Sequence, residues 1–160
     1  MSSATHELSF GGALLARGFW LYVWEVRTRS GKQLYYVGRT GDSSSPNAQS
    51  PFNRLGQHLG ANANSSGLRN HLTSRGVDPE QCEFRLVAHG PIFAEAATED
   101  EHRRPRNDMA AFERELAHLM REAGYAVMNS VRCKTPLDAA RFQSIRAAFA
   151  EFFPKLGWQL

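Results

Sequence analysis

The chain has 160 residues and a mass of 17.9 kDa, a size that suits one domain. Apolar residues make up 42% of it and charged residues 22%, which excludes a wholly disordered chain. No apolar run reaches the roughly 20 residues that a membrane-spanning helix needs. Two cysteines, Cys82 and Cys133, are too few for a disulfide scaffold or a four-thiolate zinc site. The net charge is +3, and 16 of the 19 cationic side chains are arginines, whose planar fork suits phosphate oxygens.

The first residues do not have the pattern of a secretory signal. Residues 10–16 are mildly apolar, but no basic stretch precedes them, and Arg17 interrupts the run. Together with two unpaired cysteines, this pattern predicts a protein of the reducing cytoplasm without a membrane partner.

The first half of the chain predicts a hairpin followed by two short helices. Residues 19–28 are aromatic and β-branched, which predicts a buried strand, and residues 33–38 predict its partner across a turn. A loop rich in serine and asparagine follows. Ser50 offers a capping hydroxyl before a proline, which predicts a helix ending near residue 60.

A second short helix is predicted over 68–75, with Ser65 or Ser66 as its cap. Residues 81–88 alternate between polar and apolar side chains, which predicts a third strand. An acidic and then basic run over 98–106 predicts a solvated loop.

Two longer helices are predicted to complete the chain. Asn107 is the expected cap of a helix that ends at Gly124, because apolar residues recur between them at helical spacing. The last helix is expected over 136–153. Its buried stripe is predicted to comprise Phe142, Ile145, Phe149 and Phe152.

This order of elements predicts an α+β domain, with a small three-stranded antiparallel sheet flanked by helices and a C-terminal helix. All of 1–160 is expected to form a single domain, with 19–130 as the core and 135–160 as a helical cap. The aromatic C-terminal helix could cover the sheet or contact a second copy, so both a monomer and a homodimer stay open.

An ordered set of polar residues spans most of the chain. Trp20-Leu21-Tyr22 lies on the first predicted strand and Tyr36-Val37-Gly38 on the second, and Arg54 precedes His58 by one helical turn. Glu113 lies on the first of the two long helices, with Asn129 sixteen residues later. The set resembles the GIY-YIG nuclease superfamily, in its restriction-enzyme-like branch with a long loop before the helical arginine.

The resemblance covers residues 20–129 and implies a metal-dependent endonuclease that hydrolyses phosphodiester bonds. It implies that Glu113 holds Mg²⁺ or Mn²⁺ and that Arg54 grips a phosphate oxygen. His58 would orient a phosphate or a tyrosine hydroxyl, and Asn129 completes the catalytic set. On residue type alone, Glu115 competes with Glu113, and position beside apolar neighbours favours Glu113.

The resemblance also implies that a tyrosine activates the water. The spacing does not separate the roles of Tyr22 and Tyr36, although we favour Tyr22. A free phenol has a pKa near 10, so a nearby cation such as Arg39 is expected to lower it.

DNA is the expected partner, and RNA stays open. The candidate contacts are Arg39, Thr40 and Arg69, together with the small polar side chains of loop 41–50. The first signature reads Trp-Leu-Tyr where the family has Gly-Ile-Tyr, so the alternative is a non-catalytic nucleic-acid-binding or protein-interaction domain on the same scaffold.

Overall fold

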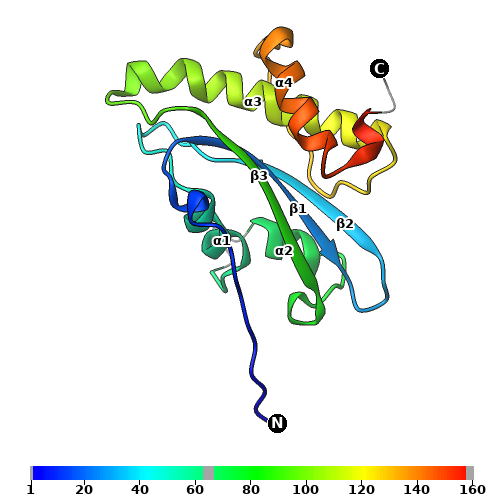
Figure 1. The fold of residues 1–160 in the computed structure, drawn as a ribbon. Helices are drawn as coiled ribbons and strands as arrows, with labels where there is room; N and C mark the ends of the chain where they lie inside the picture. The colour runs from blue at the N-terminus through cyan, green and yellow to red at the C-terminus, as the bar shows by residue number, and fades with distance from the viewer. Residues whose placement is uncertain (1, 63–66, 158–160) are drawn as a thin grey trace.

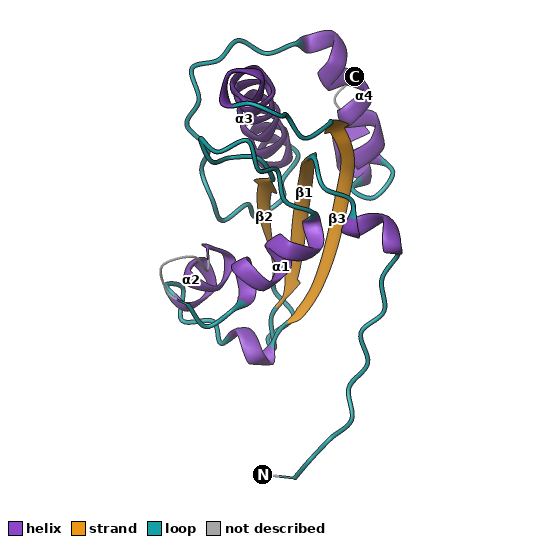
Figure 2. Cartoon of the chain, turned by 90° about the vertical axis from the view of Figure 1, so that its left-hand side faces the viewer, coloured by secondary structure: helices purple, strands orange, loops and turns teal. Residues whose placement is uncertain are grey.

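The computed structural model describes residues 2–62 and 67–157 and has an α+β fold built on a three-stranded antiparallel sheet (Figure 1). The strands are β1 (Phe19–Arg27), β2 (Gln33–Arg39) and β3 (Glu83–Phe93). They lie in the order β2-β1-β3, with β1 in the middle (Figure 2). The third strand is longer than the predicted 81–88, because β3 pairs with β1 along the whole length of β1. The predicted fold class is confirmed.

Two helices cover each face of the sheet (Figure 1). On one face lie α1 (Pro51–Leu59) and α2 (Gly67–Thr73), and on the other lie α3 (Glu99–Glu122) and α4 (Ala139–Ala150). No helix within residues 2–62 and 67–157 is long and apolar enough to cross a membrane. Short 3-10 helices span Gly12–Leu15, Pro79–Gln81 and Pro154–Gly157.

The start of α1 is the one predicted from the sequence. The Ser50 hydroxyl accepts a hydrogen bond from the backbone N–H of Asn53, as expected of a capping serine. The predicted caps of α2, Ser65 and Ser66, lie outside the described residues.

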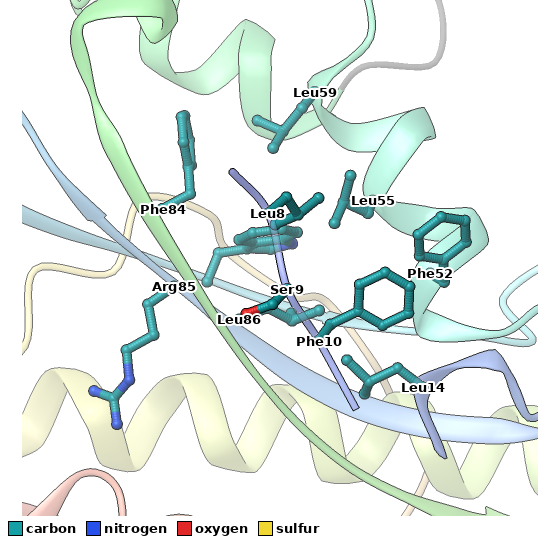
Figure 3. Close-up of a pocket in the computed structure, with 11 residues that line it drawn as sticks. Leu8, Ser9, Phe10, Leu14, Phe52, Leu55, Leu59, Phe84, Arg85 and Leu86 are labelled. Atoms are coloured by element: carbon teal, nitrogen blue, oxygen red, sulfur yellow. The ribbon is translucent and has the colours of Figure 1, made fainter. Parts of the chain in front are cut away.

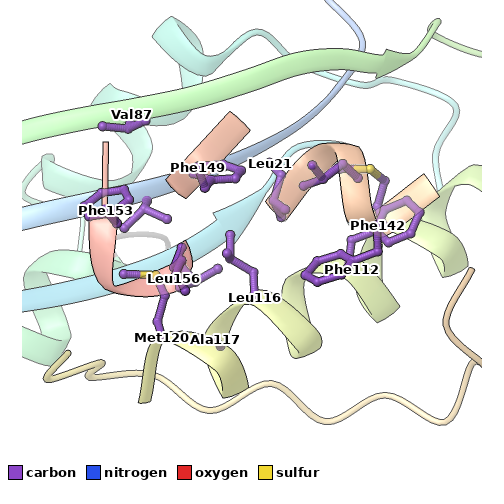
Figure 4. Packing of buried hydrophobic residues seen from close by; sticks show 14 of the residues in the cluster. Leu21, Val87, Phe112, Leu116, Ala117, Met120, Phe142, Phe149, Phe153 and Leu156 are labelled. Carbon is purple, nitrogen blue, oxygen red and sulfur yellow. The ribbon is translucent and has the colours of Figure 1, made fainter. Parts of the chain in front are cut away.

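The sheet separates two apolar clusters. Alternate residues of a strand point to opposite faces, so the neighbours Tyr35 and Tyr36 enter different clusters. Tyr35 joins the larger cluster beneath α3 and α4, where Leu21 and Phe112 also pack (Figure 4). Tyr36 and Tyr22 face α1 and α2. The two tyrosines of the signature motifs therefore share one face of the sheet.

The predicted loop over 98–106 is wrong, because α3 begins at Glu99. The Thr98 hydroxyl caps it by accepting from the backbone N–H of Glu101, so Asn107 lies inside the helix. The added turns at the start of α3 contain His102, and no neighbouring residue in the sequence indicates that this histidine is buried. His102 is fully buried, and its Nε2 lies 2.9 Å from the carbonyl oxygen of Ser43.

The last helix begins later than residue 136 and ends earlier than expected. Asp138 caps it by accepting from the backbone N–H of Arg141, and it ends at Ala150. Beyond that point the chain leaves helical phase, so Phe152 is 50% exposed while Phe153 is 1% exposed. The expectation that Phe152 is buried is therefore wrong, and Phe153 takes its place in the core.

Candidate active site

Three of the predicted residues meet on the α1 and α2 face of the sheet. Tyr22 is 1% exposed, and its Oη lies 2.5 Å from His58 Nε2, a direct hydrogen bond. The Tyr36 ring meets the same imidazole edge-on, with centroids 5.1 Å apart. The packing of α1 on the sheet thus brings both strand tyrosines to one histidine.

A glycine makes this arrangement sterically allowed. Gly38 stands directly opposite Tyr22 in the β1–β2 ladder. A Cβ at Gly38 would lie 2.5 Å from the Tyr22 ring, closer than any side chain tolerates. The Tyr22 ring therefore packs directly over the glycine of the Tyr36-Val37-Gly38 motif, where no side chain would fit.

Arg54 extends from the same helix as His58 but lies nearer to solvent. Its Nη1 donates to Gln57 Oε1 at 2.9 Å, and its Nη2 donates to Asp42 Oδ2 at 3.3 Å. Its Nε is buried and has no hydrogen-bond partner among the described residues. Asp42 follows β2 in the sequence but was not singled out by sequence reasoning, because nothing local connects it with a helix that begins nine residues later.

Glu113 reaches the cluster from the opposite layer. It lies on α3, is 8% exposed, and forms an ion pair with Arg39 at the end of β2. Burial raises the pKa of the Glu113 carboxyl, and the Arg39 guanidinium opposes this shift. The prediction that this helix turns a carboxylate inward at Glu113 agrees with its burial.

Asn129 acts on the backbone of β2. Its Nδ2 donates to the carbonyl oxygen of Val37 at 2.6 Å, and its Oδ1 accepts from the Val37 N–H at 3.0 Å. The asparagine amide therefore pairs with the edge strand between Tyr36 and Gly38. In this position it supports the site through the backbone and does not point into it.

The three predicted nucleic-acid contacts lie in very different surroundings. Thr40 is fully buried, and its hydroxyl donates to the carbonyl oxygen of Gly18, so the structure does not place it at a nucleic-acid surface. Arg69 donates to the carbonyl oxygen of Leu59 at 3.2 Å, at the end of α1. Arg39 is engaged by Glu113.

Burial dominates the protonation of the cluster. It raises the pKa of Tyr22 above its ordinary value and that of Tyr36 to about 12. Arg39 lowers the pKa of Tyr36 as expected, but by less than burial raises it. Burial, aided by the Arg54 charge, lowers the pKa of His58 to about 4. At neutral pH both phenols are protonated and the imidazole is neutral.

The donor set suits a hard cation that keeps most of its water. No group of three His, Cys, Asp or Glu side chains gathers for a metal in the part of the chain that the structure describes. Mg²⁺ is commonly held by one or two carboxylates, with water and substrate oxygens completing its shell. Glu113 could be such a carboxylate ligand if Arg39 released it. The negative charge of Asp42 raises the pKa of the same carboxyl, which indicates that the two acidic groups are close.

The cluster also leaves donors without partners. Buried side-chain nitrogens of three of its residues have no hydrogen-bond partner among the described residues: Arg39 Nε, Arg54 Nε and His58 Nδ1. Leaving a buried polar group unpaired is unfavourable by about 1–3 kcal/mol. Two of these atoms belong to guanidinium groups, so an anion is the ligand that would satisfy them.

The described part of the chain also forms an apolar cavity (Figure 3). It has a volume of about 450 Å³ and lies between α1, β3 and the N-terminal segment. Phe10 stacks on Phe52 at its rim, with centroids 4.9 Å apart. None of the residues of the polar cluster lines it, so we do not assign the chemistry to this cavity.

Comparison with models of known protein families gave no match, and neither did comparison with curated proteins or with solved structures.

Proposed function

We propose that the protein is a metal-dependent endonuclease of the GIY-YIG type that hydrolyses phosphodiester bonds in DNA. The observation that supports it best is the convergence of Tyr22, Tyr36, Arg54, His58 and Glu113 at the end of β2. These side chains come from both strands of the hairpin and from a helix on each face of the sheet.

Arg54 and Arg39 are the groups that would bind the scissile phosphate. Both guanidinium groups have a buried Nε without a partner among the described residues. Hydrogen bonds from guanidinium to phosphate are charge-assisted and roughly twice as strong as neutral ones. Glu113 would hold Mg²⁺ or Mn²⁺, which when bound neutralises developing charge on the phosphoryl oxygens and acidifies a bound water.

The hydrogen bond to His58 supports Tyr22 as the base. A protonated phenol can take a proton from water only if it passes its own proton on in the same step. For Tyr22 the acceptor in contact is His58 Nε2, at 2.5 Å. In this scheme the water proton moves to Tyr22 Oη while the phenolic proton moves to the imidazole. Tyr36 then serves as a hydrogen-bond donor to phosphate or water.

One observation favours the alternative of a non-catalytic binding domain. Arg39 pairs with Glu113, the only carboxylate assigned to the metal, and must release it before a cation can bind. If that pair is permanent, the scaffold binds nucleic acid through its guanidinium groups without cleaving it.

Cleavage of supercoiled plasmid separates the two functions. We expect nicking with Mg²⁺ or Mn²⁺ and none in EDTA. Glu113→Gln should lower the rate by at least about 100-fold, since it removes the metal ligand. The matched control is Glu115→Gln, which neutralises a neighbouring carboxylate of α3 and should leave the rate unchanged.

Failure to nick with any metal, or full activity in Glu113→Gln, would contradict the nuclease proposal. Binding of DNA without cleavage would support the alternative. A labelled single-stranded RNA run in parallel tests whether RNA is the substrate.

A further inference from the structure

The carboxylate of Asp42 lies where Arg54 would meet an anion. Asp42 Oδ2 accepts from Arg54 Nη2 at 3.3 Å, and Arg54 Nη1 is engaged by Gln57. Only Nε of that guanidinium lacks a partner among the described residues. A phosphate that binds Arg54 through Nε and Nη2, the two nitrogens of one edge, would therefore compete with Asp42 for Nη2.

The backbone on both sides of Asp42 is held in place. Two residues before it, the Thr40 hydroxyl donates to the carbonyl oxygen of Gly18 at 2.5 Å. One residue after it, the carbonyl oxygen of Ser43 lies 2.9 Å from Nε2 of the buried His102. These hydrogen bonds hold the backbone next to Asp42 in place, so the carboxylate would leave Arg54 by rotation of its side chain.

The exposure of the ion pair is compatible with such a rotation. The side chain of Asp42 is 44% exposed, whereas that of Arg54 is 22% exposed. The carboxylate is thus on the solvent side of the pair. Rotation would move it into water and leave the guanidinium in the cluster.

Asp42 also sets the charge of the whole cluster. Its carboxylate acts on three further titratable groups by raising the pKa of each: Tyr36, His58 and Glu113. With Asp42 in place, the two acidic side chains balance the positive charges of Arg39 and Arg54. A phosphodiester that approaches this cluster in the free protein therefore meets two neutralised ion pairs and no free guanidinium charge.

We propose that Asp42 is an internal competitor for substrate phosphate, bound to Arg54 in the free protein and displaced when a phosphodiester binds. This inference rests on the proposed function, because it takes phosphate to be the ligand of Arg54. Because Asp42 must give way to the phosphate, it lowers the affinity for nucleic acid. In the free protein it holds the Arg54 guanidinium in position. Asp42 is a positioning residue that acts through Arg54.

The test is equilibrium binding of a fluorescein-labelled DNA duplex in EDTA, which prevents cleavage. Asp42→Asn keeps the shape of the side chain and removes its charge, and Asp42→Ser is a second variant. The control is Asp100→Asn, which makes the same charge change in the exposed pair with Arg103 on α3.

Both Asp42 variants should bind about two- to fivefold more tightly than the control, the effect of one partly exposed ion pair. The dependence of log affinity on log salt should steepen by about 0.9, because one more cation becomes free to neutralise a phosphate. A purely structural role would not change that slope in this direction.

Equal affinity and slope in the Asp42 variants and the control would overturn the inference, as would weaker binding. If the wild type nicks plasmid while the Asp42 variants show no tighter binding, the inference alone falls. If none of the proteins binds or cleaves DNA, the proposed function falls with it.

Discussion

The stability of the protein should depend on pH through His58. Burial, the larger cause, and the Arg54 charge lower the pKa of this histidine from 6.5 to about 4 in the folded protein. In the unfolded chain the imidazole regains its ordinary pKa, so the unfolded state binds more protons between these two values. The contribution of His58 to stability is therefore complete above about pH 6.5 and is lost as the pH falls toward about 4.

The size of the effect follows from the pKa difference. At about 1.4 kcal/mol for each pH unit, complete loss corresponds to about 3 kcal/mol. Between about pH 7 and about pH 4.5 the expected loss is about 2 kcal/mol. That is a large part of the 5–15 kcal/mol typical of a folded domain.

The assay is urea unfolding of the wild type and of His58→Gln at both pH values. Glutamine can still accept a hydrogen bond from Tyr22 but cannot become charged. The free energy of unfolding of the wild type should therefore fall by about 2 kcal/mol more than that of the variant. His118→Gln, which removes an exposed imidazole of α3, is the matched control and should follow the wild type. Equal losses in the wild type and in His58→Gln would refute the reasoning.

Two further substitutions test the backbone contacts that hold the site. Gly38→Ala should destabilise the protein by about 1–3 kcal/mol in urea unfolding, because its Cβ would overlap the Tyr22 ring. Gly56→Ala, which adds a Cβ to α1 in open space, is the control and should stabilise the protein by about 0.5–1 kcal/mol. If Gly56→Ala were the more destabilising of the two, the close packing of Tyr22 on Gly38 would be refuted. Asn129→Ala should cost about 2–4 kcal/mol, because it leaves both backbone groups of Val37 unpaired. The Val37 amide should then exchange its hydrogen faster, and an unchanged exchange rate would contradict this role.

Local patterns predicted much of the fold. The aromatic and β-branched composition of residues 19–28 indicated the central strand, and the serine–proline signal marked the start of α1. The prediction failed at 98–106, where the run of charges resembles a loop. There the helix is set by the burial of His102 against Phe19 and the chain near Ser43, contacts made far away in the sequence.

The site shows the same limit. Periodicity and motif order selected Tyr22 on the central strand and Glu113 on α3, and the structure buries both. The partners of these residues depend on how the layers pack, so no local pattern could predict that Arg39 pairs with Glu113 or that Asp42 pairs with Arg54. The predicted nucleic-acid contact at Thr40 is wrong for the same reason, because its burial depends on a contact with Gly18, which is distant in the sequence.

The two edges of the sheet differ in what they offer to another polypeptide. Along β2, the chain after α3 forms a parallel bridge at Tyr35, and the Asn129 amide occupies the backbone of Val37. The outer edge of β3 has no such cover among the described residues. A strand added to this sheet would therefore pair with β3, where Pro91 lacks an N–H and interrupts a continuous ladder.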